Sequence, residues 1–215
     1  MQVGDIVLSV ATLQDDSGTK LPRTLIRVGQ WLKEKWLGSS GGTGLPVVHA
    51  AIAVGNNIVI ESVGAGILAT DLTQEKPPRS AVIYASDKPW LGINAATIAS
   101  QFYADREANS IVGKYSLKKA MASIISAGKG SNDLMQRITE SVSIGDTSFC
   151  SQFVVNCYEA GNLSARDNLN TPPPRIFNQK PSAMTPDELW KFCEGPKNGF
   201  KFAGFWQDGV QHYDV

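Results

Sequence analysis

Short apolar runs and alternating apolar residues predict that the first half of the chain is rich in β-strands. Residues 47–63 have the pattern of a hairpin around Gly55-Asn56-Asn57, and further runs lie on either side of it. A last apolar run near the C-terminus predicts a strand at the edge of the sheet. The expected strands are Ile6 to Ala11, Val47 to Val54, Ile58 to Glu61, Ala81 to Tyr84 and Phe200 to Trp206.

Apolar residues at helical spacing predict several helices. The sequence Thr185-Pro186-Asp187-Glu188 is typical of a helix start, because a capping residue is followed by proline and then by acids. Gly38 to Gly44 is expected to be a loop, and Thr171 to Pro174 extended chain. The predicted helices are Leu21 to Leu37, Asn94 to Ala108, Lys118 to Ala127, Asp133 to Ser141, one that begins near Cys150 and one that follows Thr185.

The helix near Cys150 has the most clearly marked ends. Residues 146–148 are Asp, Thr and Ser, which are all good N-caps, and Gly161 is of the type preferred just after a helix. Cys150, Val154 and Cys157 fall on one stripe, so we expect that stripe to face the core. The Cys150 sulfur would then lie where the helix meets the sheet.

The composition is that of one globular domain and argues against a nucleic-acid partner. The chain has 215 residues, 42% of them hydrophobic, and its 20 basic and 20 acidic residues cancel. A chain without net charge lacks the excess of basic residues that is typical of proteins that bind nucleic acid or an anionic membrane surface. We therefore expect a single domain over residues 1–215, in which residues 161–215 form a C-terminal extension.

No segment has the pattern of a signal peptide or of a membrane span. The N-terminus has no basic stretch followed by an apolar one, and no apolar run approaches membrane-spanning length. We expect a protein that is made in the cytoplasm and has no integral membrane segment.

The three cysteines predict reduced thiols. Cys150, Cys157 and Cys193 have no metal-ligand spacing, and an odd number argues against a disulfide framework. Along a helix, Cys150 and Cys157 would lie roughly 10 Å apart, too far for a disulfide. We expect no metal and no cofactor, and buried, inert positions for Cys157 and Cys193.

Cys150 and His49 are the best candidates for chemistry. The thiolate is the nucleophilic form of cysteine, and both a helix N-terminus and a neighbouring imidazole lower the thiol pKa. His49 lies in the strand-like run 47–54, where Ala51 and Ala53 on the same face would leave room for a helix. Free N–H groups in the first helical turn could stabilise an oxyanion after attack on a carbonyl.

The register of the predicted hairpin decides whether Glu61 can assist His49. With a three-residue loop, Val54 pairs with Ile58 and Ala51 pairs with Glu61. The Glu61 carboxylate then reaches His49 diagonally, over a Cβ separation of roughly 7 Å. A two-residue loop would shift the pairing by one and send Glu61 to the opposite face. We favour the three-residue loop, in which Glu61 orients the imidazole and favours its charged form.

Six segments occur in an informative order. They are Gly4-Asp5-Ile6-Val7-Leu8, Leu25-Ile26-Arg27, His49-Ala50-Ala51-Ile52-Ala53-Val54-Gly55, Val59-Ile60-Glu61-Ser62, Gly113-Lys114-Tyr115-Ser116 and Phe149-Cys150-Ser151-Gln152-Phe153-Val154. In this order they resemble the circularly permuted NlpC-type branch of papain-like cysteine hydrolases, whose neighbourhood includes YiiX-like proteins and lecithin:retinol acyltransferase. The resemblance spans about residues 1–162, and an ordered set is far more specific than one motif. In the unpermuted enzymes the cysteine precedes the histidine, whereas here His49 comes first.

This resemblance implies an α+β fold, in which a papain-like antiparallel sheet packs against the helix that bears the nucleophile. It implies Cys150 as nucleophile, His49 as base and Glu61 as the polar third member.

The substrate site is expected to include Tyr115, Ser148 and Ser151. Tyr115 is followed by Ser116, where YiiX-like sequences usually have aspartate, so this chain departs from the pattern there. Residues 31–45 and those after 162 are poorly covered by the resemblance. We expect substrate selection in those two segments.

Similar enzymes most often cleave amide bonds in peptidoglycan stem peptides, so the resemblance implies an amidase or endopeptidase on these peptides. Without a signal peptide, such a domain looks like a toxic effector that a contact-dependent apparatus such as type VI secretion delivers to a target-cell periplasm. A cognate immunity protein would then be its partner.

Two alternatives stay open. The first is a lipid-directed acyl hydrolase or acyltransferase that uses the same dyad, with Trp31, Trp36 and Ile124-Ile125 lining an acyl-chain site. The second is a catalytically silent binding module, for which Cys150→Ala would change no phenotype.

Overall fold

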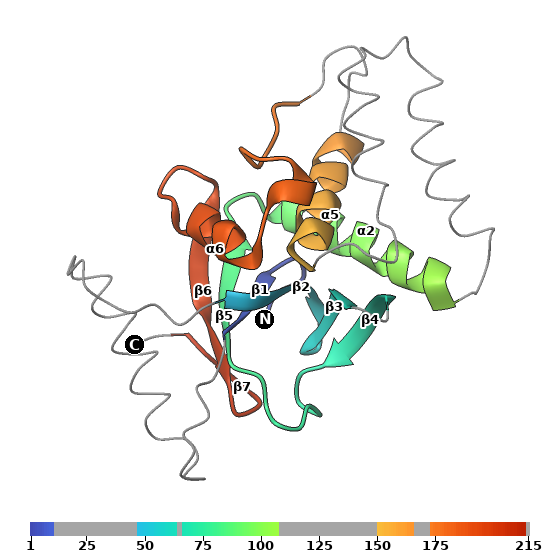
Figure 1. Cartoon of the computed structure of the whole chain (residues 1–215), viewed down its shortest axis with the longest axis vertical. Helices are drawn as coiled ribbons and strands as arrows, with labels where there is room; N and C mark the ends of the chain where they lie inside the picture. The colour runs from blue at the N-terminus through green and yellow to red at the C-terminus, as the bar shows by residue number, and fades with distance from the viewer. Residues whose placement is uncertain (11–46, 64–65, 108–149, 166–172, 214–215) are drawn as a thin grey trace.

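A curled antiparallel sheet of seven strands organises the described part of the chain (Figure 1). The structure is a computed structural model, and it describes residues 1–10, 47–63, 66–107, 150–165 and 173–213. The strands are β1 (Ile6–Val10), β2 (Val47–Gly55), β3 (Ile58–Val63), β4 (Gly66–Asp71), β5 (Ala81–Ser86), β6 (Phe200–Gln207) and β7 (Val210–His212). The helices within these ranges are α2 (Pro89–Glu107), α5 (Cys150–Ser164) and α6 (Pro186–Glu194), with a short 3₁₀ helix η1 (Pro181–Ala183).

The fold is of the mixed α+β class. The strand order is β4-β3-β2-β1-β5-β6-β7, and every neighbouring pair is antiparallel. In Figure 1 the helices gather on one side of this sheet. None of the helices in the described ranges combines the length and the apolar character that a membrane span requires.

The sheet differs from the expected one at both ends. Strand β4 was not predicted from the sequence, because Gly66–Asp71 mixes apolar and polar residues without a clear period. The prediction that Phe200 to Trp206 forms an edge strand is wrong, since β7 pairs along its outer side. A turn at Asp208 and Gly209, both with positive φ, returns the chain to form this three-residue strand.

The two faces of the sheet bury different clusters. Ile6 and Ile52 belong to the main core, which also contains residues of α2, α5 and α6. Successive strand residues point to opposite faces, and Ala51 and Ala53 join Trp206 of β6 in a smaller cluster. The expectation that these alanines make room for a helix is therefore wrong, because α5 packs on the other face.

The β2–β3 hairpin combines a two-residue turn with a bulge. Asn56 and Asn57 both have positive φ, and Gly55 pairs with Ile58, so the predicted pairing of Val54 with Ile58 is wrong. Between the Ala53 and Gly55 pairs the register shifts by one residue. This extra residue cancels the shift that a two-residue turn would otherwise impose.

The helix predictions are partly confirmed. Thr185 caps α6 through a complete capping box with Glu188, as the sequence pattern predicts. Helix α2 begins at Pro89, five residues before the predicted start at Asn94. The predictions for residues 21–37, 38–44, 118–127, 133–141 and 146–148 lie outside the described residues.

Gly161 has a different role from the predicted one. Helix α5 continues through Gly161 to Ser164, so this glycine does not follow the helix end. A Cβ atom at this position would lie 2.9 Å from the Ala95 backbone nitrogen and 3.1 Å from atoms of Asn94. The absence of a side chain lets α5 pack closely against α2.

The described part of the C-terminal extension belongs to the same core. Phe177, Phe192 and Phe200 are buried and pack against one another. Phe177 and Phe200 also pack against Tyr158 of α5, and the ring centroids of all these pairs are 5.0–6.1 Å apart. Aromatic pairs at such separations contribute packing energy beyond the area they bury. Residues 173–213 therefore help to hold the helix that carries Cys150.

Gly4 permits a close approach between the chain just before β1 and helix α2. It has φ +90°, and a Cβ atom there would lie 2.2–2.4 Å from backbone atoms of Gly92. We expect Gly4→Ala to lower the free energy of unfolding by about 2–4 kcal/mol, because overpacking and positive φ both cost energy. Gly209→Ala is the matched control, since Gly209 has φ +81° but no atom within 4 Å. Chemical denaturation measures both variants, and equal losses would contradict the packing argument.

Candidate active site

Cys150 is the first residue of α5, and it lies half-buried at the border of the main core. Its sulfur accepts hydrogen bonds from the backbone N–H groups of Ser151 in the helix and Ala50 in β2. These two N–H dipoles, one at the helix start and one in the strand, favour a negative charge on this sulfur. The predicted position, at the junction of the helix and the sheet, is the one observed.

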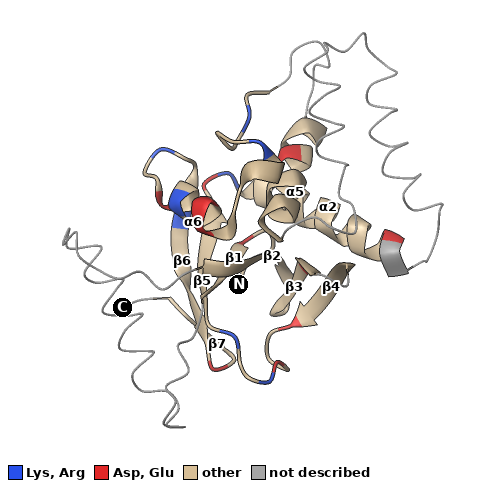
Figure 2. Cartoon of the chain, in the orientation of Figure 1, with Lys and Arg blue, Asp and Glu red and all other residues tan. Residues whose placement is uncertain are grey.

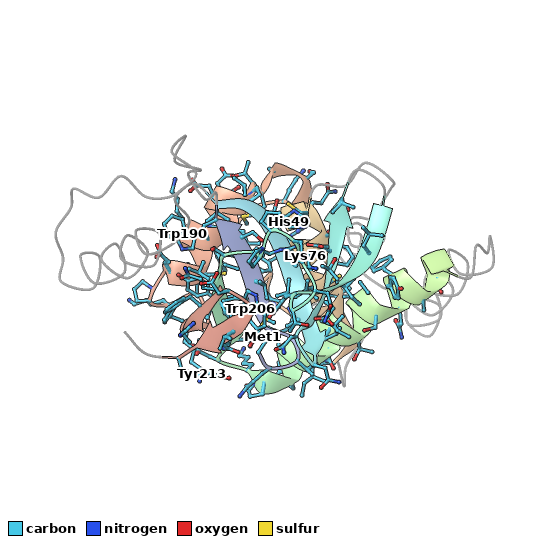
Figure 3. All side chains as sticks on the ribbon, turned by 90° about the horizontal axis from the view of Figure 1, so that it is seen from below. Met1, His49, Lys76, Trp190, Trp206 and Tyr213 are labelled. Carbon is cyan, nitrogen blue, oxygen red and sulfur yellow. The ribbon has the colours of Figure 1, made fainter. Side chains whose placement is uncertain are left out.

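His49 lies in β2 beside a bulge. It pairs with Ser9 of β1, whereas the next pair joins Val10 to Val47, so Val48 is the extra residue. Bulges re-aim neighbouring side chains and are frequent next to active sites. Figure 3 labels His49, whose side chain is 22% exposed.

The His49 ring connects Cys150 with Glu61. Its Nε2 atom is 2.7 Å from Oε2 of Glu61, and the ring also forms a hydrogen bond with the Cys150 thiol. Because Nε2 is occupied by the carboxylate, Nδ1 is the nitrogen left for the sulfur. The three side chains therefore form one hydrogen-bonded series.

This series favours charge on both the thiol and the imidazole. Burial alone would lower the pKa of His49, but the hydrogen bonds and charges of Cys150 and Glu61 outweigh it and raise this pKa to about 9. Burial alone would raise the pKa of Cys150, but the hydrogen bond and charge of His49 bring it below the ordinary thiol value. Both shifts favour a thiolate–imidazolium pair over the neutral pair.

Glu61 is a buried residue of β3 whose carboxylate contacts the imidazole of His49. It pairs with Ala51 of β2, which confirms the predicted register, and its side chain is 4% exposed. Burial would raise the pKa of this carboxyl group, but hydrogen bonds from His49, Arg79 and Thr70 hold the pKa well below its usual range. The carboxylate therefore stays ionised next to the imidazolium.

The other two cysteines lack this environment. Cys157 and Cys193 are free thiols that are almost fully buried. Burial raises the pKa of both thiols well above the ordinary value. Among the three cysteines, only Cys150 has the microenvironment of a reactive thiol.

The predicted substrate-site residues are placed differently. Ser151 is fully buried, and its hydroxyl donates a hydrogen bond of 2.6 Å to the carbonyl oxygen of Met184. This contact ties the start of α5 to the segment before α6, so the hydroxyl serves the fold and the backbone N–H faces the sulfur. Tyr115 and Ser148 lie outside the described residues.

Two further residues of the site were not found from the sequence. Thr70 donates to Oε1 of Glu61 from β4, and Arg79 contacts both oxygens of Glu61 from the β4–β5 connection. Recognising β4 would have placed Thr70 diagonal to Glu61, because Thr70 pairs with Val59. Arg79 follows two prolines in a connection without periodicity, so no local signal predicts its contact.

No group of three or more His, Cys, Asp or Glu side chains that could bind a metal ion occurs in residues 1–10, 47–63, 66–107, 150–165 and 173–213. Charged residues of both signs are interspersed along the described ribbon (Figure 2), in agreement with the neutral composition.

Comparisons with protein-family models, with curated proteins and with solved structures find no significant match for this chain.

Proposed function

We propose that the protein is a cysteine hydrolase in which Cys150 is the nucleophile, His49 the general base and acid, and Glu61 the group that orients His49. One observation carries this proposal. The His49 ring forms hydrogen bonds with Cys150 on one side and with Glu61 on the other, at the N-terminus of a helix. A nucleophile, a base and an orienting carboxylate in series are the parts that acyl transfer requires.

The reaction would proceed through an acyl-enzyme. His49 takes the thiol proton of Cys150, and the thiolate forms a bond to the carbonyl carbon of the substrate. The bond to the leaving group then breaks, and His49 gives its proton to that group. In the second half, His49 takes a proton from water, the hydroxide attacks the thioester, and the thiolate is released with the free acid as product.

Backbone N–H groups at the start of α5 would stabilise the oxyanion of each tetrahedral intermediate. The first turn of a helix has N–H groups without an intrahelical partner. The N–H groups of Ser151 and Ala50 already face the sulfur, so partial positive charge is concentrated at the position where the carbonyl would bind.

We infer that the sheet and the Cys150 helix form a permuted papain-like core of the NlpC type. The order of the site residues supports this inference, since His49 on β2 and Glu61 on β3 precede Cys150 on α5. The substrate proposed on this basis is the amide bond of a bacterial peptidoglycan stem peptide. The corresponding biological role is that of an antibacterial effector acting in a target-cell periplasm, with a cognate immunity protein as partner.

Expression in a bacterial host tests this function. The wild type and Cys150→Ala are each produced in the cytosol and, with an export signal, in the periplasm, while lysis and the muropeptide profile are followed. Lysis that occurs only in the periplasm, needs Cys150 and accompanies cleaved stem peptides is the expected result.

Other outcomes would change or overturn the proposal. Toxicity that needs Cys150 but leaves muropeptides intact would redirect the search to lipid or protein substrates, which mass-resolved lipid extracts would identify. The residues suggested for an acyl-chain site, Trp31, Trp36 and Ile124-Ile125, lie outside the described residues. Identical behaviour of wild type and Cys150→Ala would exclude an enzymatic role.

A further inference from the structure

Arg79 approaches the site from the connection between β4 and β5. This connection, residues 72–80, begins with Leu72, which is buried in the smaller core cluster, and it includes Lys76, labelled in Figure 3. Arg79 lies just before β5, and its side chain is 15% exposed. A charged group so far withdrawn from water needs specific partners.

The Arg79 guanidinium is held on two sides. Nη1 is 2.7 Å from Oε2 of Glu61, and Nη2 is 3.0 Å from Oε1, which is a bidentate contact. On its other edge, Nε is 2.9 Å from Oε2 of Glu75 and Nη2 is 2.5 Å from Oε1. A planar guanidinium fixed by two carboxylates has little rotational freedom.

This contact completes the hydrogen bonds of the Glu61 carboxylate. Two oxygens of a carboxylate offer about four lone-pair sites. His49 and Arg79 occupy Oε2, while Thr70 and Arg79 occupy Oε1. The plane of the carboxylate is therefore set by three partners from three different segments, and any rotation toward another partner would break at least one of these bonds.

We propose that Arg79 is a positioning residue for the hydrolysis, which holds the Glu61 carboxylate in the orientation that presents Oε2 to Nε2 of His49. This inference rests on the proposed function, because it assigns Arg79 a role in the same reaction. Arg79 contacts neither Cys150 nor a reacting atom in the described hydrogen bonds, so it acts through Glu61 and His49.

A positional role and a purely electrostatic role differ in the sign of one effect. If Arg79 acts only by its charge, its removal takes a cation away from the imidazolium, and the pKa of His49 rises. If Arg79 holds Glu61 in place, its removal frees the carboxylate to turn away, and the pKa of His49 falls. The direction of the change therefore separates the two roles.

The experiment compares Arg79→Met and Arg79→Lys with the wild type in the full-length protein. For both variants we expect kcat to fall about 10- to 100-fold with KM unchanged, because a small misplacement of a catalytic group has an effect of this size. The pKa of His49, measured by an NMR titration, should fall from about 9 toward its ordinary value of 6.5. Lysine keeps the charge but cannot form the bidentate contact, so it should not restore the rate.

Two further variants keep the test decisive. Lys191→Met removes a cation from an exposed ion pair with Asp187, and it should change neither kcat nor the pKa of His49. Glu75→Gln weakens the outer support of Arg79 without removing the guanidinium. If Arg79→Met does not fold, Arg79→Lys and Glu75→Gln test the proposal in its place. Each of these two variants should have a lower kcat and a lower pKa of His49 than the wild type.

The outcomes separate this proposal from the proposed function. Equal activity of wild type and Cys150→Ala would overturn the hydrolase itself. In a second outcome, hydrolysis needs Cys150 while the Arg79 variants keep the wild-type kcat and show an unchanged or raised pKa of His49. That result would overturn only the proposed role of Arg79. Full rescue by Arg79→Lys would show that charge and not geometry is what the reaction requires.

Discussion

Cys150→Ala is expected to reduce hydrolysis of the susceptible substrate by about 10⁴-fold or more, because removal of a catalytic nucleophile has effects of at least this size. Alanine has no atom that can form the acyl-enzyme, and the remaining N–H groups can only bind the carbonyl. The half-buried thiol is small, so we expect the fold to tolerate its removal. Single-turnover and steady-state rates of the purified protein measure the loss.

Two controls accompany this variant. Cys193→Ala also removes one thiol, but Cys193 is a buried residue of α6 whose thiol pKa is raised by burial, so hydrolysis should persist. Cys150→Ser keeps a hydroxyl in place of the thiol, and it should remain strongly impaired because a hydroxyl is a weaker nucleophile than a thiolate. Substantial activity of Cys150→Ala would contradict the assignment of the nucleophile.

His49→Gln is expected to reduce hydrolysis by about 10³-fold or more, since general acid–base catalysis and thiol activation are lost together. It should also change the reactivity of the thiol. In the wild type, His49 brings the pKa of Cys150 below the ordinary value, so alkylation by iodoacetamide approaches its full rate at lower pH than for a free thiol. Without the imidazole, burial acts to raise this pKa, so the midpoint of alkylation should move to higher pH.

The measurement is the alkylation rate of Cys150 as a function of pH, followed by mass spectrometry of the modified peptide. His212→Gln provides the matched control, because His212 is the only other histidine and lies exposed in β7. That variant should leave the midpoint and the hydrolysis rate unchanged. An identical midpoint in wild type and His49→Gln would show that the imidazole does not activate the thiol.

Local signals in the sequence were reliable where one short segment contains all the interacting groups. The cap at Thr185 is confirmed, and it needs only the reciprocal hydrogen bonds of Thr185 and Glu188 within one helical turn. The hairpin over residues 47–63 and the helix at Cys150 are likewise confirmed. These elements follow from periodicity and capping, which depend on residues close in the chain.

The pairing of Glu61 with Ala51 was predicted correctly through an incorrect turn. The sequence pattern favours a three-residue loop, whereas the structure has two turn residues, Asn56 and Asn57, and one extra residue in β2. Both arrangements leave three residues of the hairpin unpaired, so both keep Ala51 opposite Glu61. Side chains in a strand alternate, so the number of unpaired residues decides which face Glu61 occupies.

The sequence by itself determined which residue types could perform the chemistry and where the strand and helix that carry them begin. It could not determine that Thr70 and Arg79 complete the site, that Gly161 serves helix packing, or that Ala51 lies opposite the helices. Each of these facts is a contact between segments that are separate in the chain, and such contacts depend on strand order, sheet curl and the path of a connection. Only the tertiary structure decides them, because residue spacing specifies neighbours along an element and not across the fold.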